Sequence, residues 1–318
     1  MSFVETDVRG SARTVAVSLV YKPNFEILWA QIDALCCQVD AIFIVNNGEE
    51  SDLRRIESRY FGEKKVILKQ LPCNVGVAAG FNAGIVAAQE LSPEFILLMD
   101  QDSVPEAGMV DGLVRVHFER ARLGVKTFAV GPRYVSHKSS DDCCLIRIRS
   151  NVIEALSISD KNGAVEECSY LISSGCLVNA AAAARIGGML EDLFIDLVDI
   201  EWGLRAKSMG YVCLLEPKVV LNHSIGEYKR TVRFMFKERL LTMHHPFRYY
   251  YMWRNAILLA RLEYIPSCFS RYLIAGRIKH LLISITACDQ KLNLLYYSVL
   301  GVVHGLIGRS GGLKPKLK

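Results

Sequence analysis

The sequence lacks several patterns that would place it in a common class of protein. Its ten cysteines include no paired Cys-x-x-Cys spacing, so we expect no zinc site of that kind and interpret them as reduced thiols. The first residues contain no basic stretch followed by an apolar run, so we expect no secretory signal. The net charge of +5 is modest and diffuse before residue 200, which argues against a nucleic-acid partner.

Two familiar phosphate-binding motifs are also missing. No Gly-Lys-Ser or Gly-Lys-Thr occurs, which excludes a P-loop, and no Gly-x-Gly-x-x-Gly directly follows a predicted strand. Apolar residues nevertheless make up 51% of the 318 residues, which is enough for a sizeable folded core. The mean hydropathy of +0.21 is high for a purely soluble protein, so part of the chain carries an apolar excess.

The N-terminal part of the chain alternates between β-branched apolar runs and segments with helical periodicity. Strands are predicted at 14–21, 41–45, 65–70 and 95–99, with helices between them, and Asn24 is a suitable cap for the first helix. This order predicts an α/β fold with a mostly parallel sheet and helices on both faces. Ligands of such folds bind at the carboxyl ends of the strands, so functional residues are expected there.

Two carboxylates follow the fourth predicted strand. Asp100 and Asp102 come directly after a run of five apolar residues, long enough for a strand buried on both faces, and Pro105 limits its continuation. Two acids at a strand end suit a hard divalent cation that carries phosphate oxygens. The alternative is a polar exit from the strand with a helix cap, because Asp-x-Asp also occurs by chance.

A segment rich in small residues lies before that strand. It runs from Asn74 to Gly84 and includes Gly76, and its small side chains would let the backbone approach a ligand closely. Asn74 and Asn82 offer amide donors and acceptors for the same purpose. The alternative is a helix that packs tightly through its small residues.

A second group of acids lies in the later half of the chain. A helix predicted from about Val198 carries Asp199 at its start. Trp202, three residues later, lies on the same face of this helix, whereas Glu201 points elsewhere. These acids cannot all be buried unpaired, and Arg205 is a suitable partner for Glu201. We therefore expect one of them to be functional, and a capping acid at a helix start is the alternative.

Further strands are predicted at 128–132, 210–217 and 219–226, and His223 lies near the end of the last. Residues 133–165 are polar and predict an irregular excursion without regular strands. A lone histidine is more often a structural hydrogen-bonding residue than a ligand, so His223 by itself predicts no site.

In this order the motifs resemble the inverting family 2 glycosyltransferases of GT-A fold, and more narrowly their bacterial rhamnosyltransferase branch. The resemblance covers about residue 13 to about residue 260 and rests on strand ends at Tyr21–Asn24 and Val45–Gly48, on the Asn74–Gly84 segment, on Asp100-x-Asp102 and on a Tyr-Tyr-x-x-Arg-Asn pattern at 250–255. It implies a GT-A-type Rossmann-like mixed sheet and an enzyme that acts on a nucleotide sugar.

The resemblance also implies roles for the donor side. Asn46, where most relatives carry an acid, would hold the base, since an amide carbonyl can accept its imide N–H. The nucleotide-sugar site would comprise Asn46, Asn74, Gly76, Asn82, Asp100 and Arg254. Arg254 would meet a phosphate, unless it is a snorkelling arginine of an interfacial helix. Asp100, Asp102 and His223 would bind Mn2+ or Mg2+, which neutralises the departing diphosphate.

On the acceptor side, residue matching puts Asp199 on the general base, which takes the proton of the attacking hydroxyl. Glu201 and Trp202 would flank it beside the acceptor. The implied reaction moves L-rhamnose from dTDP-L-rhamnose, with inversion, onto a glycan or undecaprenyl-linked precursor of a surface polysaccharide such as O-antigen. A UDP-hexose donor and a sugar-nucleotide-binding protein without turnover stay open. A nucleotidyltransferase would require a basic glycine-rich loop after the first strand, and this sequence has no such loop there.

The apolar excess lies between residues 272 and 307, in a predicted helical amphipathic region (263–318) that follows a catalytic domain (1–262). Its apolar runs are interrupted by charge or are shorter than the ~20 residues of a spanning helix. With Arg271, Arg277, Lys279 and the basic end of the chain, they favour a cytoplasmic protein bound peripherally to the anionic inner face of the cell membrane. A helical pair that packs on the catalytic domain or forms a homodimer is the alternative.

Overall fold

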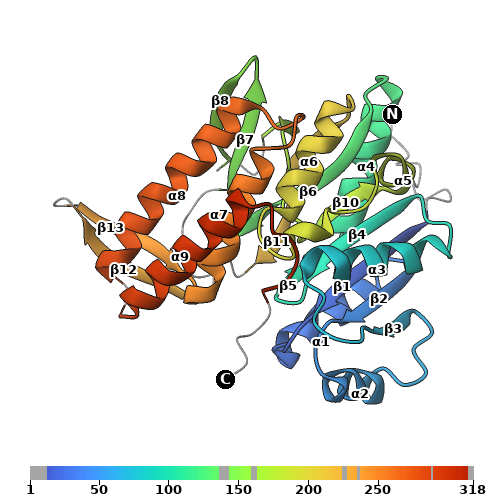
Figure 1. Cartoon of the computed structure of the whole chain (residues 1–318). Helices are drawn as coiled ribbons and strands as arrows, with labels where there is room; N and C mark the ends of the chain where they lie inside the picture. The colour runs from blue at the N-terminus through green and yellow to red at the C-terminus, as the bar shows by residue number, and fades with distance from the viewer. Residues whose placement is uncertain are drawn as a thin grey trace.

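A nine-stranded mixed sheet forms the centre of the molecule (Figure 1), in the order β3-β2-β1-β4-β10-β6-β11-β5, with β9 paired to β11. The computed structural model describes residues 13–135, 143–158, 163–223, 228–234, 237–287 and 289–313. The strands are β1 (Thr14–Val20), β2 (Ala41–Asn46), β3 (Val66–Gln70), β4 (Phe95–Asp100), β5 (Ser103–Pro105), β6 (Thr127–Val135), β9 (Glu166–Cys168), β10 (Cys176–Asn179) and β11 (Val212–His223). The first four pair in parallel, as the alternating sequence predicts.

Helices cover both faces of the sheet, which confirms the predicted α/β class. They are α1 (Phe25–Cys36), α2 (Glu50–Arg59), α3 (Val77–Gln89), α4 (Met109–Arg122), α5 (Ala180–Ile186), α6 (Val198–Ser208) and the short 3-10 helix η1 (Glu191–Leu193). Successive residues of β1 point to opposite faces. Val15 and Val17 enter the core under α3 and α6, whereas Ala16 and Val20 enter the core under α1 and α4.

The small residues of α3 serve close packing on the sheet. A Cβ at Gly84 would lie 2.3 Å from Val17 Cγ1, and one at Gly80 would lie 2.5 Å from Leu19 Cδ1. At these two positions the alternative interpretation of the segment, tight packing, is the one that the structure shows.

Two sequence predictions about the middle of the chain are wrong. The described part of 133–165 is not irregular, because β7 (Cys143–Arg149) and β8 (Val152–Ile158) form an antiparallel hairpin and β6 continues to Val135. The two strands predicted at 210–217 and 219–226 are one strand, β11, with a register shift between Glu216 and Val220. Pro217 lies in this irregularity, where its missing N–H removes a ladder hydrogen bond.

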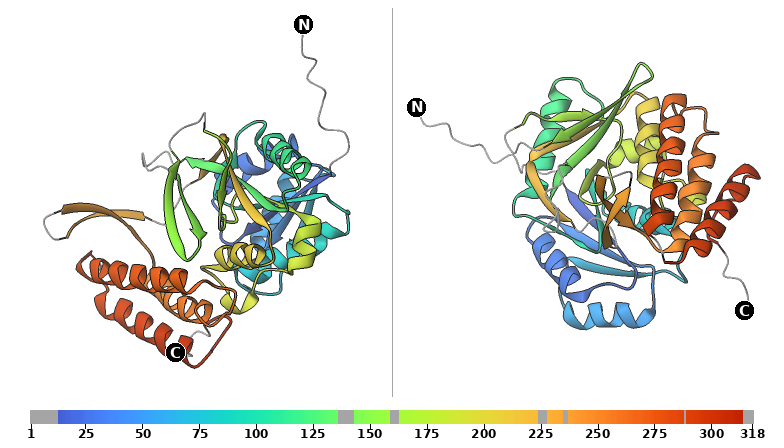
Figure 2. Two further views of the ribbon diagram at one scale, coloured as in Figure 1. Left: turned by 90° about the horizontal axis from the view of Figure 1, so that it is seen from above. Right: turned by 90° about the vertical axis from the view of Figure 1, so that its left-hand side faces the viewer.

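A layer of three helices lies to one side of the sheet (Figure 1, Figure 2): α7 (Pro246–Leu259), α8 (Ser267–Ala287) and α9 (Lys291–Leu306). The hairpin β12 (Tyr228–Phe234) and β13 (Lys237–Met243), which the sequence did not predict, precedes them. Gly301 and Gly305 let α9 lie closely along α7, since a Cβ at Gly301 would lie 2.4 Å from the Tyr250 carbonyl oxygen. No described helix combines the length and hydrophobicity needed to cross a membrane.

One cation in this layer differs from expectation. Arg277 was grouped with Arg271 and Lys279 as a residue facing a membrane, but it is mostly enclosed in the structure, whereas the other two are exposed. Eight of the ten cysteines have described side chains, and all eight are free thiols, in agreement with the reduced state expected of them.

Candidate active site

The carboxyl ends of neighbouring parallel strands bring the predicted residues to one edge of the sheet. In the register of the sheet, Asp100 at the end of β4 lies opposite Leu19, and Asn46 at the end of β2 lies opposite Val20. The turn after β4 is held from below by Gln31 of α1, whose Nε2 donates to the carbonyl oxygens of Asp100 and Ser103 at 2.6 Å each. Sequence reasoning did not single out Gln31, because a fully buried glutamine on an apolar helix face carries no motif.

Three carboxylates converge at this edge. The pKa of Asp100 is raised to about 7, first by burial and then by the nearby carboxylates of Asp102 and Asp199, while Ser173 and Arg248 act in the opposite direction. Burial also raises the pKa of Asp199. Like charges gathered in a partly buried place are unfavourable unless a proton or a cation joins them.

Ser173 connects two of these acids. Its side chain lowers the pKa of Asp100, and its backbone N–H donates to Asp199 Oδ2 at 3.2 Å. The Ile200 N–H donates to Asp199 Oδ1 at 2.8 Å. Both carboxylate oxygens of Asp199 are therefore oriented by backbone donors at the start of α6, where the helix dipole also favours a negative charge.

The donor set of Asp100 and Asp102 fits a hard divalent cation, because both side chains offer oxygen and their mutual repulsion would be relieved by positive charge. The third predicted ligand, His223, lies opposite Ser103 in the β5–β11 pair, and Ser103 directly follows Asp102 in the chain. Its side chain is outside the described part of the structure. Among the described side chains, no three His, Cys, Asp or Glu residues are grouped as metal ligands.

The loop before α6 adopts a strained backbone next to the acids. Phe194, Asp196 and Leu197 all have positive φ angles, between 63° and 66°. Non-glycine residues seldom adopt this conformation, and it persists only where the surroundings hold it. Arg248 at the start of α7 provides one such contact, with Nη2 at 2.9 Å from Asp196 Oδ1.

Arg254 and Asn255 of α7 hold the same loop from the other side. The Arg254 guanidinium is fully buried and donates to the carbonyl oxygens of Asp192, Leu193 and Gly311, while Asn255 Nδ2 donates to those of Leu193, Ile195 and Asp196 at 2.6 to 3.0 Å. The predicted contact of Arg254 with a phosphate stays a prediction. The contacts observed here are positioning contacts that sequence reasoning missed.

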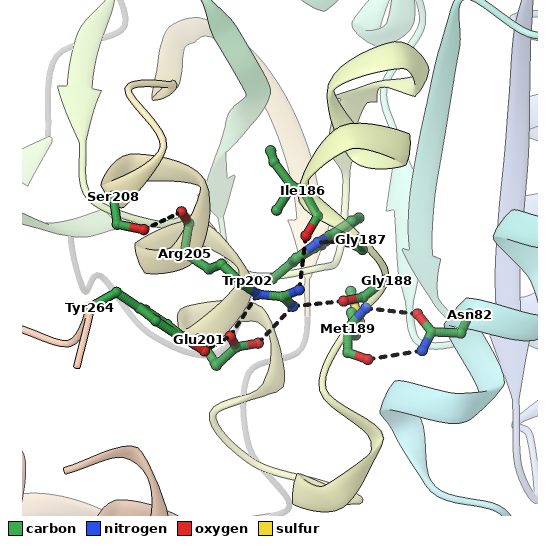
Figure 3. Close-up of polar contacts among 10 residues, drawn as sticks. All are labelled: Asn82, Ile186, Gly187, Gly188, Met189, Glu201, Trp202, Arg205, Ser208 and Tyr264. Atoms are coloured by element: carbon green, nitrogen blue, oxygen red, sulfur yellow. Dashed lines mark hydrogen bonds and ion pairs between the residues drawn. The ribbon is translucent and has the colours of Figure 1, made fainter. Parts of the chain in front are cut away.

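Glu201 and Trp202 lie inside the protein (Figure 3). The predicted pairing of Glu201 with Arg205 is confirmed, at 2.8 Å between Oε1 and Nε, and the Tyr264 hydroxyl also donates to Glu201. Arg205 then donates to the carbonyls of Ile186 and Gly188, and Trp202 Nε1 donates to that of Gly187 at 2.7 Å. Together these side chains fasten the loop at 186–189 to α6, and their predicted place beside an acceptor stays a prediction.

Asn82 reaches the same loop from α3. It pairs with the backbone of Met189 in both directions, donating at 2.9 Å and accepting at 2.8 Å (Figure 3), and also donates to Glu191. Asn74 Oδ1 accepts from Gly76 N–H at 3.0 Å and from Asn47 Nδ2 at 3.2 Å.

Gly76 is required where it stands. Its φ is +90°, and a Cβ there would lie 2.5 Å from the Phe194 ring. The Phe194 carbonyl also accepts from Val77 N–H at 2.6 Å, so the strained loop caps the N-terminus of α3. The two predicted motifs, at 74–84 and 191–205, therefore touch through this contact.

Asn46 is fully buried at the end of β2. Its Nδ2 donates to the Glu49 carbonyl and to Gln70 Oε1, each at 2.7 Å, and its Oδ1 accepts from Gly48 N–H at 3.1 Å. The amide is thus held in one orientation, with its oxygen toward the turn.

The mixed sheet with helices on both faces and acids at the carboxyl end of β4 is the fold of the GT-A glycosyltransferases. Residues 21–136 match the model of Glycosyl transferase family 2, which identifies this part of the chain as a glycosyltransferase domain. A dTDP-rhamnosyl transferase, RfbF of Shigella flexneri, is 28% identical over 298 residues, which cover 93% of this chain and 96% of that relative.

Solved structures agree on the fold. TarS 1–349 of S. aureus, in complex with UDP-GlcNAc, superposes with a TM-score of 0.58 at 12% identity, covering 93% of this chain and 81% of that one. The mannosyltransferase PcManGT from Pyrobaculum calidifontis, in complex with GDP-Man and Mn2+, gives a TM-score of 0.54 at 12% identity, covering 94% and 88%.

Proposed function

We propose that this glycosyltransferase moves L-rhamnose from dTDP-L-rhamnose, with inversion, onto a glycan or lipid-linked precursor of a surface polysaccharide such as O-antigen. The observation that carries the catalytic part is the convergence of Asp100, Asp102 and Asp199, two acids at a strand end and one at a helix start. The donor sugar is supported by the likeness to the dTDP-rhamnosyl transferase of Shigella flexneri.

In this proposal Asp199 is the general base. Its two oxygens are oriented by the N–H groups of Ser173 and Ile200, which leaves further lone pairs for the acceptor hydroxyl. Burial raises the pKa of Asp199, and a base whose pKa is closer to the working pH accepts a proton more readily in the transition state. The proton of the attacking hydroxyl would pass to this carboxylate as the bond to the anomeric carbon forms.

Asp100 and Asp102, with His223, would hold Mn2+ or Mg2+, which when bound supplies charge neutralisation for the departing nucleoside diphosphate. Asn46 would hold the base. Its carbonyl oxygen has two lone pairs and Gly48 uses one, so the second can accept the imide N–H of thymine or uracil. Asn74, Gly76 and Asn82 would shape the donor side through the turn and helix that they hold.

The first test is binding of dTDP, UDP and GDP, each with and without Mn2+, followed by thermal unfolding. We expect stabilisation that requires Mn2+ and is largest for dTDP. A preference for UDP would keep the transferase and replace rhamnose by another donor sugar. A second assay supplies the sugar nucleotide itself. Hydrolysis or transfer of its sugar distinguishes an enzyme from a protein that only binds a sugar nucleotide.

We further propose that residues 263–318 attach a catalytic domain of residues 1–262 to the cytoplasmic face of the cell membrane. The side of α9 that does not contact α7 carries Leu292, Leu295, Tyr296, Val299, Val303 and Leu306, all exposed and spaced as one helix face. Lys291 and Arg309 bracket this face, and cations beside an apolar helix face match an anionic lipid surface. A homodimer through α9 is the competing outcome of the test.

A further inference from the structure

The inner face of α8 carries one cation between apolar residues. Leu273 packs against the apolar cluster that contains Leu204 of α6, and Leu281 packs against the cluster that contains Tyr249 of α7. Arg277 lies one helical turn after Leu273 and one before Leu281, on the same face. Its side chain is therefore directed between α6 and the start of α7, within reach of the charges of Asp196 and Arg248.

The Arg277 side chain is partly buried, and one donor of its guanidinium has no partner. Its Nε is buried without a hydrogen-bond partner, and within the described ranges Arg277 makes no hydrogen bond or ion pair. Burial lowers the pKa of Arg277, the Asp196 carboxylate raises it and the Arg248 guanidinium lowers it. A buried donor without a partner is costly, and a ligand that accepts a hydrogen bond from it would remove that cost.

Arg248 faces the same place from the start of α7. It contacts Asp196 through Nε and Nη2, at 3.2 and 2.9 Å from Oδ1, and its charge also reaches Asp100. Asp196 is thus the carboxylate nearest to both guanidinium groups. One carboxylate between two guanidinium groups leaves an excess of positive charge where α7 and α8 face the loop before α6.

We propose that Arg248 and Arg277 together bind the diphosphate group of a substrate, in a site that α8 completes. The inference deepens the proposed function, on which the identity of the substrate rests. Guanidinium groups bind phosphate oxygens bidentately, and a diphosphate carries enough negative charge to engage two of them. The diphosphate belongs either to the nucleotide donor or to a lipid-linked acceptor. Binding of dTDP and binding of pyrophosphate distinguish these two sources.

The test uses the full chain with Arg277→Met, Arg277→Lys and, as a matched control on the exposed side of the same helix, Arg271→Met. For a donor diphosphate, we expect the Kd for dTDP with Mn2+ to rise roughly tenfold in Arg277→Met, as for loss of a charged hydrogen bond. The Kd for dTMP should change little. Arg277→Lys should recover part of the affinity, because it keeps the charge without the planar fork.

For an acceptor diphosphate, the probe is inorganic pyrophosphate added to the enzyme saturated with dTDP. Here we expect the wild type to bind pyrophosphate, Arg277→Met to bind it roughly tenfold more weakly, and the Kd for dTDP to stay unchanged. If the wild type binds dTDP, and Arg277→Met binds both dTDP and pyrophosphate as tightly as the wild type does, the proposed diphosphate site is overturned. A wild type that binds no nucleoside diphosphate overturns the proposed function instead. Pyrophosphate binding then still tests the proposed diphosphate site.

Thermal unfolding without ligand separates binding from a purely structural role. We expect Arg277→Met to melt at or above the temperature of the wild type, since it removes a buried donor that has no partner. A structural role in pairing with Asp196 would lower the melting temperature and leave both affinities unchanged, which would overturn the proposal. If Arg277→Met does not fold, Arg277→Gln provides the same comparison with a polar side chain.

Discussion

The backbone N–H of Ser173 donates to the Asp199 carboxylate at 3.2 Å, while the side chain of the same serine lowers the pKa of Asp100. A single turn between β9 and β10 thus orients the candidate base and acts on one candidate metal ligand. Because the donor of this contact belongs to the backbone, the contact does not depend on the side chains of Ser173 and Asp100. The two acids can therefore be tested separately.

Asp199→Asn should lower the rate of sugar transfer by about 10²- to 10⁴-fold, because the amide cannot take the proton of the acceptor hydroxyl. Binding of dTDP should change little, and the measurement is a steady-state assay beside a binding titration. Asp33→Asn, a half-exposed acid on α1, is the control and should behave like the wild type. Transfer at a near-wild-type rate in Asp199→Asn would show that another residue is the base.

The stability of the metal-free protein should fall as the pH rises through the titration of Asp100. Its pKa is raised from 3.8 to about 7 in the folded state, so between these values the folded protein binds more protons than the unfolded chain. Stability from this group is then largest at low pH and decreases toward pH 7. Thermal unfolding between pH 5 and pH 8 checks this, and Asp100→Asn should remove part of the slope.

Mn2+ should reverse that trend. The cation competes with protons for the carboxylates, so its stabilising effect should be larger at pH 8 than at pH 5. An equal effect at both pH values would argue against metal binding at Asp100.

Arg205→Met should destabilise the protein by about 3 kcal/mol, because it leaves the fully buried Glu201 carboxylate without its cation and frees the loop at 186–189. Urea denaturation is the measurement. Arg54→Met removes another i,i+4 partner of a glutamate, Glu50, but both side chains are largely exposed, so we expect no measurable change there. Equal effects in the two variants would mean that the buried pair contributes little.

Gly84→Ala should destabilise the protein by about 1 to 3 kcal/mol, since the new methyl group would overlap Val17. The control is Gly276→Ala in α8, where nothing lies within 4 Å of the added Cβ. There alanine should be neutral or stabilise by up to about 1 kcal/mol through helix propensity. The measurement compares the melting temperatures and denaturant midpoints of the two variants with those of the wild type.

Val299→Glu should weaken binding to vesicles that contain anionic lipid, because it places a charge in the exposed apolar face of α9. Asn293→Glu adds the same charge at another exposed position of α9 and should have a smaller effect. Sedimentation with vesicles is the measurement, and chromatography of both variants tests the competing dimer. Removal of residues 271–318 is a poorer experiment, because it also takes away the cover of α7 and the Gly311 contact of Arg254.

Much of the site was predictable because it depends on short-range order. An apolar run that ends in Asp100 predicts a buried strand with an acid at its carboxyl end, and parallel pairing then brings it beside β1 and β2. The Glu201–Arg205 pair follows from a spacing of four on a helix. By contrast, no local pattern indicates that Gln31 holds the turn after β4, or that Arg254 and Asn255 hold the strained loop before α6.

The sequence by itself determined the alternation of strands and helices and the acids at the strand end and the helix start, because each depends on neighbours along the chain. Only the tertiary structure decided that residues 143–158 form a hairpin, that β11 is one strand with an irregularity near Pro217, and that Arg277 is directed inward. These features depend on which surfaces meet across large sequence separations. Residue type and periodicity do not encode such meetings, since an arginine on an amphipathic helix can face water, lipid or a buried site.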